Sequence, residues 1–103
     1  MEYRVKISAK ALNDMEAIYD YIALQLQVPD TAMKYYNRIA EAIESLTVFP
    51  ERCKLFGVGD EWSRGLRRLL VEHYPIFYEV NGHTVNILRV LYSSTDLAQK
   101  LNE

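Results

Sequence analysis

The sequence predicts an α+β domain in which a helical hairpin packs on a small antiparallel sheet. Two amphipathic runs, at about 9–26 and 31–47, carry apolar residues at three- and four-residue steps, as helices do. Three runs rich in Leu, Val, Ile, Tyr and Phe follow at 66–71, 74–80 and 83–92, as strands do. With a short alternating run at 3–8, the expected order is β-α-α-β-β-β, followed by a short terminal helix at about 96–101.

Composition describes an ordinary globular protein. A length of 103 residues predicts one domain over 1–103, and 50% hydrophobic with 25% charged residues excludes a disordered chain. Cys53 is the single cysteine, so an internal disulfide is excluded and a reducing cytoplasm is expected. The charged, alternating start is unlike a signal peptide, and no apolar run reaches about 18 residues, so we expect no membrane span.

Charge is distributed unevenly along the chain. The formal net charge of −2 gives no general attraction to nucleic acid. The predicted sheet is nevertheless positive, because its arginines outnumber its acidic residues: Arg64, Arg67, Arg68 and Arg89 against Glu72 and Glu79. The acidic surroundings argue against a large phosphate-binding surface.

The first predicted strand and helix share a clear boundary. In the strand at 3–8 the residues Tyr3, Val5 and Ile7 fall on one face. Ser8 is the expected N-cap of the helix, because its hydroxyl can accept a hydrogen bond from a free amide of the first turn. The expected apolar seam of this helix is Leu12, Met15, Ile18 or Tyr19, Ile22 and Leu26.

The second helix is expected to run back along the first. Pro29-Asp30 ends the first helix, with Asp30 as the expected N-cap of the second. Phe49-Pro50 ends the second helix, and the loop at 51–63 is too apolar for a free linker. The narrow apolar seam of the second helix suits an antiparallel partner: Ala32, Tyr36, Ile39, Ile43 and Leu46.

Two features stand out in the sheet. Asn81-Gly82 between alternating runs predicts a hairpin with a type I′ turn, which needs positive φ at both central residues. The run 85–91 is apolar on both alternations except at Asn86 and Arg89, which predicts a central strand covered on both faces. A guanidinium there needs a partner, so we expect either a bridge from Arg89 to Glu72 or Glu79, or a functional role.

Metal and cofactor chemistry has no support in the sequence. His73, His83 and Cys53 lack the spacing of metal ligands, so no metal site and no cofactor are expected. Cys53 reads better as a packed thiol than as a nucleophile.

The chain resembles the RelE/ParE superfamily of bacterial toxins from type II toxin–antitoxin systems, also called plasmid-stabilisation proteins. The resemblance covers nearly the whole chain in the same order. Its motifs are S-x-x-A-x-x-D at 8–14, I-x-x-Y-I-A at 18–23, FPER at 49–52, G-L-R-R-L-L-V at 65–71, Y-x-I-F-Y-x-V at 74–80 and V-x-I-L-R-V-L at 85–91. The resemblance implies a toxin that inhibits growth and is held inactive by an antitoxin encoded beside it.

The superfamily contains two activities, and the resemblance alone does not choose between them. RelE-like members cleave mRNA on the ribosome without a metal. For that activity the resemblance implies Arg67, Arg68 and Arg89 as phosphate-binding cations and Tyr92 as general acid or base. Surface ion pairs or antitoxin contacts would equally explain Arg67 and Arg68, and a rim position would explain Tyr92.

Two departures weaken the RelE-like reading. Pro75 stands where RelE-like nucleases carry an arginine, and proline offers neither charge nor backbone donor. Ser93-Ser94-Thr95 stands where many relatives carry a histidine and two arginines, which also weakens a detailed match to a ParE-type surface. The ParE-like features are the D-x-x-x-I-x-x-Y-I-A motif at 14–23, the G-L-R entry to the sheet at 65–67 and the missing arginine at Pro75, and on these we favour a ParE-like toxin that poisons DNA gyrase. The alternatives are a RelE-like ribosome-dependent mRNA endoribonuclease, which alone would be an enzyme, and an inactive relative that only binds antitoxin.

The expected partner is the cognate antitoxin, in a toxin–antitoxin hetero-oligomer. An antitoxin segment that folds on binding should cross the helical hairpin and the sheet. Because aromatic residues are abundant around the loop and sheet, we expect it to cover an apolar groove that includes Trp62 and Tyr74.

Overall fold

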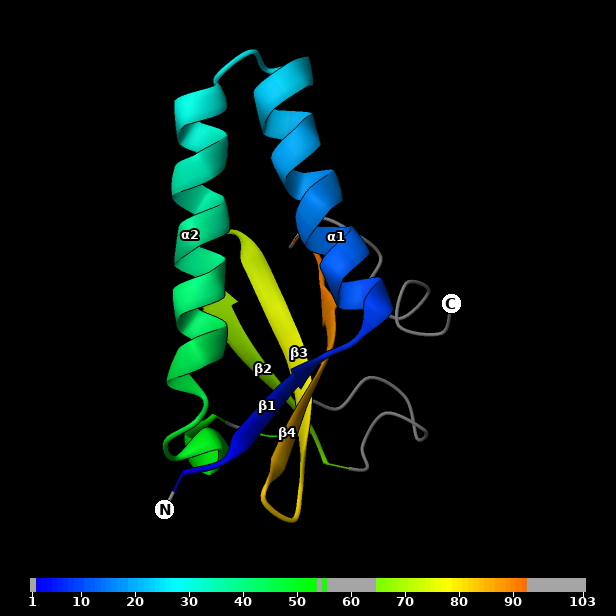
Figure 1. Cartoon of the computed structure of the whole chain (residues 1–103), viewed down its shortest axis with the longest axis vertical. Coiled ribbons are helices and arrows are strands. Elements are labelled where there is room, and N and C mark those ends of the chain that lie inside the picture. Colours follow the sequence, from blue (N-terminus) through cyan, green and yellow to red (C-terminus); the bar gives the residue numbers. More distant parts are fainter. Residues whose placement is uncertain (1, 54, 56–64, 93–103) are drawn as a thin grey trace.

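The protein is an α+β domain with two layers, confirming the predicted class and element order (Figure 1). The computed structural model describes residues 2–53, 55 and 65–92, so the expected helix at 96–101 lies outside the described residues. Helices α1 (Ala9–Asp20) and α2 (Pro29–Ser45) form a hairpin on one face of the sheet. The strands are β1 (Arg4–Ile7), β2 (Leu66–Val71), β3 (Tyr74–Asn81) and β4 (Thr84–Val90).

The four-stranded sheet has the order β1-β4-β3-β2 and is mixed rather than antiparallel throughout. Strands β2, β3 and β4 are antiparallel, as predicted, whereas β1 pairs with β4 in parallel. The whole helical hairpin and two further strands separate β1 from β4, so no tight turn forces them to be antiparallel. Strand β4 is central, as its apolar run predicted.

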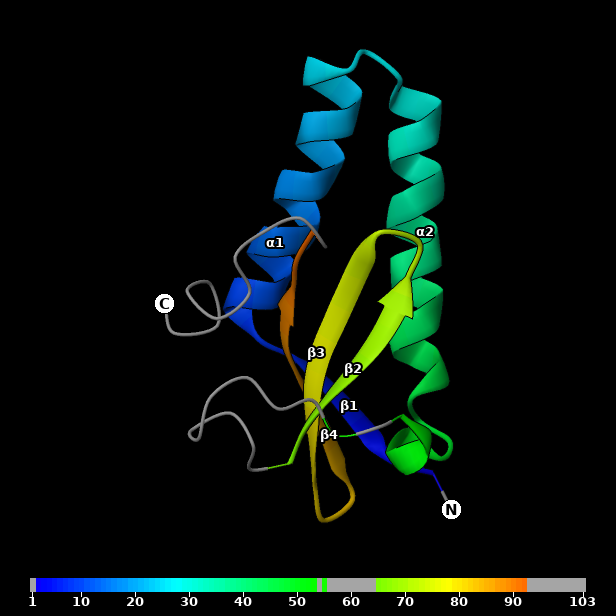
Figure 2. The same cartoon turned by 180° about the vertical axis from the view of Figure 1, so that it is seen from behind.

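Two apolar clusters cover the two faces of the sheet. Between helices and sheet lies the larger cluster, whose buried members are Ala11, Met15, Ile39, Ile43, Leu46, Ile76, Tyr78, Val85, Ile87 and Val90. The face away from the helices (Figure 2) carries a smaller cluster of Leu66, Phe77 and Leu91, with Leu88 packed against it. Strands β3 and β4 contribute to both, which explains why their sequences are apolar on both alternations.

Helix α1 begins at the predicted cap and ends in an irregular turn. The Ser8 hydroxyl oxygen accepts a hydrogen bond from the Ala11 amide at 3.0 Å, which confirms Ser8 as N-cap. After Asp20 the helix widens into the π-helix η1 (Tyr21–Gln25). Two residues of the predicted seam, Leu12 and Leu26, are 42% and 54% exposed, so the buried seam is narrower than predicted.

Helix α2 begins at Pro29, one residue before Asp30, which was predicted to be its N-cap. Pro29 occupies the first turn, Val28 is the N-cap without a side-chain hydrogen bond, and Asp30 lies inside the helix. Proline is favoured at the first helical position because its φ is already that of a helix, and the amide hydrogen it lacks would have no partner within the helix there. With Pro29 at this position, Asp30 lies inside the helix and cannot be its N-cap. The predicted seam of α2 is otherwise confirmed, since four of its residues are buried and Tyr36 packs against them.

The β3–β4 hairpin turns one residue later than predicted. Asn81 pairs with Thr84, so Gly82 and His83 are the central residues. Among the two, positive φ occurs at Gly82 alone, at 63°, which is typical of a type II′ turn rather than the predicted type I′. Asparagine remains in the ladder because glycine supplies the left-handed residue by itself.

Strand β4 contains a β-bulge at Leu88. Phe77 pairs with Arg89 and Tyr78 with Ile87, leaving Leu88 as the extra residue. The bulge changes which side chains face the helices, so Val85, Ile87 and Val90 all reach the larger cluster. None of the helices among the described residues has the length and apolar run needed to cross a bilayer.

Candidate functional site

The far end of β4 is held by α1 rather than by another strand. Strand β1 pairs with β4 only as far as Ile7 and Ile87, so beyond that point the edge of β4 would be open. The Ser8 hydroxyl donates a hydrogen bond to the Leu88 carbonyl at 2.9 Å. The Asp14 carboxylate then accepts one from the Val90 amide at 3.0 Å. The side chains of the N-cap residue Ser8 and of Asp14 in α1 therefore satisfy backbone groups that a strand would otherwise bind.

Arg89 belongs to this anchor. Its Nε and Nη2 atoms donate to the two oxygens of Asp14 at 2.7 and 2.9 Å, in a bidentate ion pair. The two side chains are only 12% and 15% exposed. The predicted alternative of a bridge to Glu72 or Glu79 is therefore wrong, because Asp14 is the carboxylate on the helix beside this edge. Glu72 instead pairs with Arg38 on the surface.

Arg67 also has a structural position. Its Nη1 atom donates to the carbonyl oxygens of Cys53 at 2.5 Å and Glu51 at 3.2 Å. Its side chain is 18% exposed and faces the same side of β2 as Leu69 and Val71, which pack beneath the helices. Arg67 thus fixes the turn after the short helix η2 (Pro50–Arg52).

The sheet register places Arg68 and Arg89 in one row. Both residues pair with Phe77, from β2 and β4 respectively. Arg68 is exposed, whereas Arg89 turns to Asp14. Tyr92 lies three residues beyond Arg89, which is about 10 Å along an extended chain. The four residues predicted as RelE-like candidates therefore do not converge: Arg67 faces the helices, and Tyr92 lies at another site.

That other site is a pocket of about 460 Å³ between the helices and one end of the sheet. We call it the tyrosine pocket. Its sheet side is formed by His73, Tyr74 and Tyr92. The pocket thus brings together Tyr74, which was predicted to bind antitoxin, and Tyr92, which was predicted to be catalytic. Its helix side is formed by Ala17, Ile18, Tyr21, Ile22, Leu26 and Tyr35.

The aromatic rings of the pocket contact one another. The ring centroids of Tyr74 lie 5.9 Å from Tyr35 and 5.7 Å from Tyr92, and His73 lies 6.4 Å from Tyr92. Burial, then the nearby hydroxyls of Tyr35, Tyr92 and Tyr21, raises the pKa of Tyr74 above its ordinary value. Its hydroxyl is therefore neutral at physiological pH and suited to hydrogen bonding rather than to proton abstraction.

The rim of the pocket is apolar and accessible. Tyr21, Leu26 and Tyr92 are 57%, 54% and 47% exposed, although they are large hydrophobic residues. Tyr21 begins the π-helix and Leu26 is its C-cap, and the wider turn between them places both on the pocket side. Contiguous exposed apolar residues of this kind mark sites of protein interaction.

One predicted site residue cannot be placed, and three residues of the site were not predicted. Trp62, predicted with Tyr74 to bind antitoxin, lies outside the described residues. Asp14, Tyr21 and Tyr35 were not among the predicted site residues. Asp14 was detectable as the last residue of the S-x-x-A-x-x-D motif, whereas the π-helix that places Tyr21 has no signal in the sequence. Within the described residues, no three His, Cys, Asp or Glu side chains are placed to hold a metal ion.

Comparisons with known proteins agree with this fold. The sequence model described as "ParE toxin of type II toxin-antitoxin system, parDE" matches residues 5–97. A structure of the chromosomal ParDE system of Pseudomonas aeruginosa is similar, with a TM-score of 0.71 and 26% identity, over 88% of this chain and 96% of that one. A comparison with curated proteins gives no match.

Two further structures share the fold at lower identity. The toxin–antitoxin complex RelBE2 of Mycobacterium tuberculosis gives a TM-score of 0.64 at 20% identity, over 89% of this chain and 99% of that one. The Escherichia coli toxin RelE, in the free state of a double mutant, gives 0.64 at 14% identity, over 97% and 93%. Both ParDE and RelBE proteins therefore have this architecture.

Proposed function

Since the chain belongs to the family of ParE toxins of type II toxin–antitoxin systems, we propose that it stops bacterial growth by binding DNA gyrase. We further propose that a cognate antitoxin silences it by covering the tyrosine pocket. The observation that carries the first proposal is that two of the three arginines RNA cleavage would need, Arg67 and Arg89, are bound within the protein.

Cleavage of RNA by its own 2′-hydroxyl requires cations that reach the phosphate as negative charge develops on it. The guanidinium groups of Arg67 and Arg89 are instead bound to protein oxygens, at exposures of 18% and 12%. Pro75 is buried in β3 and adds no cation. Action by surface recognition, which needs no catalytic group, agrees better with these positions than a nuclease does.

The second proposal follows from the exposed rim of the tyrosine pocket. Burying an apolar surface of this kind stabilises a complex in proportion to the area removed from water. Tyrosine hydroxyls on the wall can add hydrogen bonds to the backbone of a bound segment. The solved ParDE and RelBE relatives are described as toxin–antitoxin systems, which supports an antitoxin as the occupant.

The target is tested by two assays on one purified preparation. One assay measures inhibition of gyrase supercoiling and accumulation of gyrase-cleaved plasmid. The other measures mRNA cleavage on programmed ribosomes. We expect activity on gyrase alone, and the double variant Arg67→Gln/Arg68→Gln should show whether any ribosome activity depends on the sheet arginines. Cleavage of mRNA without an effect on gyrase would overturn the proposal.

The antitoxin surface is tested with two matched leucine-to-alanine variants. Leu26→Ala removes a side chain that lines the tyrosine pocket, and Leu12→Ala makes the same change at an exposed residue in the first turn of α1, outside the pocket and away from the hairpin tip. The antitoxin encoded by the adjacent gene should bind Leu26→Ala about tenfold or more weakly, because truncating a buried leucine at an interface removes at least about 1.4 kcal/mol. Equal affinities for the two variants would show that the pocket is not covered.

A further inference from the structure

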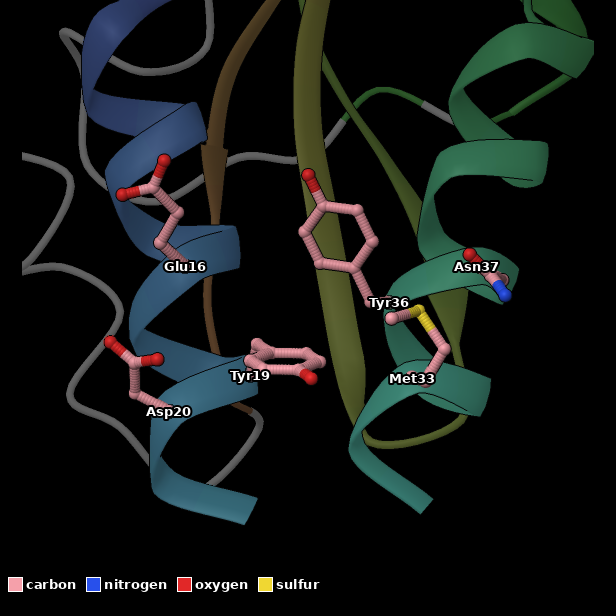
Figure 3. Close-up of a pocket in the computed structure, with 6 residues that line it drawn as sticks. All are labelled: Glu16, Tyr19, Asp20, Met33, Tyr36 and Asn37. Atoms are coloured by element: carbon pink, nitrogen blue, oxygen red, sulfur yellow. The ribbon is translucent and has the colours of Figure 1, made fainter. Parts of the chain in front are cut away.

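A second cavity lies in the groove between the two helices and differs in chemistry from the tyrosine pocket. It has a volume of about 350 Å³. We call it the acidic groove, and it is lined by Glu16, Tyr19, Asp20, Met33, Tyr36 and Asn37. Figure 3 shows Tyr19 pointing from α1 toward Tyr36 and Met33 of α2, whereas Glu16 and Asp20 project from α1 on the side away from α2.

The floor of the groove is aromatic. The rings of Tyr19 and Tyr36 have centroids 6.1 Å apart and planes at 87°. In such an edge-to-face pair, the face of one ring remains available to a further group. A cation placed over a tyrosine face is attracted by the ring quadrupole, by up to about 2 kcal/mol when water is excluded.

The wall of the groove on α1 carries negative charge that the described residues leave unpaired. Glu16 and Asp20 are exposed and lie four residues apart, so their carboxylates are neighbours on the helix surface. Neither forms an ion pair or hydrogen bond within the described part of the chain. Among the described residues that line the cavity there is no Lys or Arg. Like charges at this spacing repel each other, and a cation between them would remove the repulsion.

The combination of an apolar floor and two carboxylates selects one kind of occupant. We propose that the acidic groove binds an arginine side chain presented by an amphipathic segment of the cognate antitoxin. A planar guanidinium can stack on a tyrosine face and bond two carboxylates at once, which the ammonium of lysine does less well. The aliphatic part of the arginine would pack on Met33.

The position of the groove favours the antitoxin as the source of this arginine. Tyr19 and Tyr36 directly follow Ile18 and Tyr35, which line the tyrosine pocket. The two cavities are therefore lined by consecutive residues of the same two helices. One antitoxin that wraps the hairpin can reach both, so this inference rests on the proposed antitoxin complex.

The test measures the affinity of full-length variants for the antitoxin encoded by the adjacent gene, at low and high salt. The variant Glu16→Gln/Asp20→Asn should bind about tenfold more weakly at low salt and lose part of the salt dependence, because it removes both carboxylates but little volume. The control Glu2→Gln/Glu41→Gln removes two exposed charges outside the groove and should change affinity less than twofold.

Two further measurements separate a specific site from a general charge effect. Tyr19→Phe keeps the ring and should retain affinity, whereas Tyr19→Leu removes it and should weaken binding about threefold or more. Each antitoxin arginine is also replaced by methionine in turn. One of these replacements should weaken binding to the wild-type toxin but have little further effect on binding to the Glu16→Gln/Asp20→Asn variant.

Each other outcome contradicts the proposal in a distinct way. Unchanged affinity of the groove variant, with a loss in Leu26→Ala, would overturn the acidic groove but leave the tyrosine pocket. An equal loss of affinity in the control Glu2→Gln/Glu41→Gln would show that the effect arises from the net charge of the toxin and not from the groove. Retained antitoxin affinity with lost gyrase inhibition would assign the groove to the target rather than to the antitoxin. Circular dichroism and thermal unfolding of each variant exclude a folding defect.

Discussion

At the open edge of β4, the Asp14 carboxylate takes the place of a neighbouring strand. It binds the Val90 amide and both donors of Arg89, and all of these groups are largely removed from water. Asp14→Asn should lower the free energy of unfolding by about 2–4 kcal/mol, because it leaves the Arg89 guanidinium without a counter-charge. Urea denaturation of the free domain measures this change.

A surface ion pair provides the control for Asp14→Asn. Arg38 and Glu72 pair across α2 and the β2–β3 turn, but their side chains are 43% and 39% exposed. Glu72 has positive φ and should be left in place, so the control is Arg38→Gln, with an expected loss below about 1 kcal/mol. A similar loss in both variants would mean that the Asp14–Arg89 pair is no more than an ordinary surface pair.

Tyr78 makes stability depend on alkaline pH. Its buried hydroxyl donates to the Pro50 carbonyl at 2.6 Å, and burial, then the Cys53 side chain, raises its pKa well above the ordinary 10.0. Below pH 10 both folded and unfolded chains hold this proton. Above pH 10 the unfolded chain releases it while the folded chain retains it, so stability falls as pH rises, by up to about 1.4 kcal/mol per pH unit.

The variant Tyr78→Phe tests this assignment. It should lose about 1–3 kcal/mol at neutral pH, because the Pro50 carbonyl is left without its donor. It should also lose stability less steeply than the wild type between pH 10 and 11, as measured by urea unfolding at each pH. Parallel pH profiles for the two proteins would show that the alkaline loss arises from other groups.

At the scale of elements, one short motif fixes α1 to the sheet. Ser8 caps the helix and bonds the Leu88 carbonyl, Ala11 is completely buried, and Asp14 holds Val90 and Arg89. Ser8→Ala should therefore cost more than the 0.5–2 kcal/mol typical of a lost cap, since a second hydrogen bond goes with it.

The Ser8 prediction can be checked by comparing two substitutions. Thermal unfolding should show a clear loss in Ser8→Ala and a smaller one in Ser8→Thr, because threonine keeps the hydroxyl that both bonds need. A loss of equal size would indicate that the effect arises from the backbone at this position rather than from the hydroxyl.

Elements defined by local periodicity could be predicted, and contacts between distant elements could not. Strand β2 begins and ends where the pattern places it, and the seam of α2 is buried as expected. The parallel pairing of β1 is a choice between distant strands that no local pattern records. The Asp14–Arg89 pair spans 75 residues, so the sequence could show that Arg89 needs a partner but not which one.

In the candidate site, too, some residues could be predicted from the sequence, whereas their contacts could not. Tyr74 and Tyr92 could be named from the sequence because aromatic residues at strand ends are visible there. Their meeting with Tyr21 and Tyr35 depends on how α1, the π-helix and α2 lie over the end of the sheet. Propensity predicts helix throughout 21–25, so the wider turn that exposes Tyr21 and Leu26 required the tertiary structure.

At the scale of the whole molecule, the helical hairpin extends beyond the sheet and carries exposed apolar residues at its tip (Figure 1). Leu24, Val28 and Met33 are exposed there in addition to the rim of the tyrosine pocket. This end of the domain has apolar surface on both helices but little of the sheet beneath it. We therefore expect it to be the least stable part of the free toxin and the part most stabilised by a partner.

Antitoxin binding should thus raise the stability of the whole domain and protect the tip most. A ligand that binds only the folded state adds RT ln(1 + [L]/Kd), or about 2.7 kcal/mol at a free concentration of one hundred times Kd. Hydrogen exchange should show the largest gain in amide protection at 19–36, a segment that contributes to both cavities. In β3 and β4, the gain should not exceed the increase in the free energy of global unfolding. Protection confined to the sheet, with 19–36 unchanged, would mean that the antitoxin leaves both cavities open.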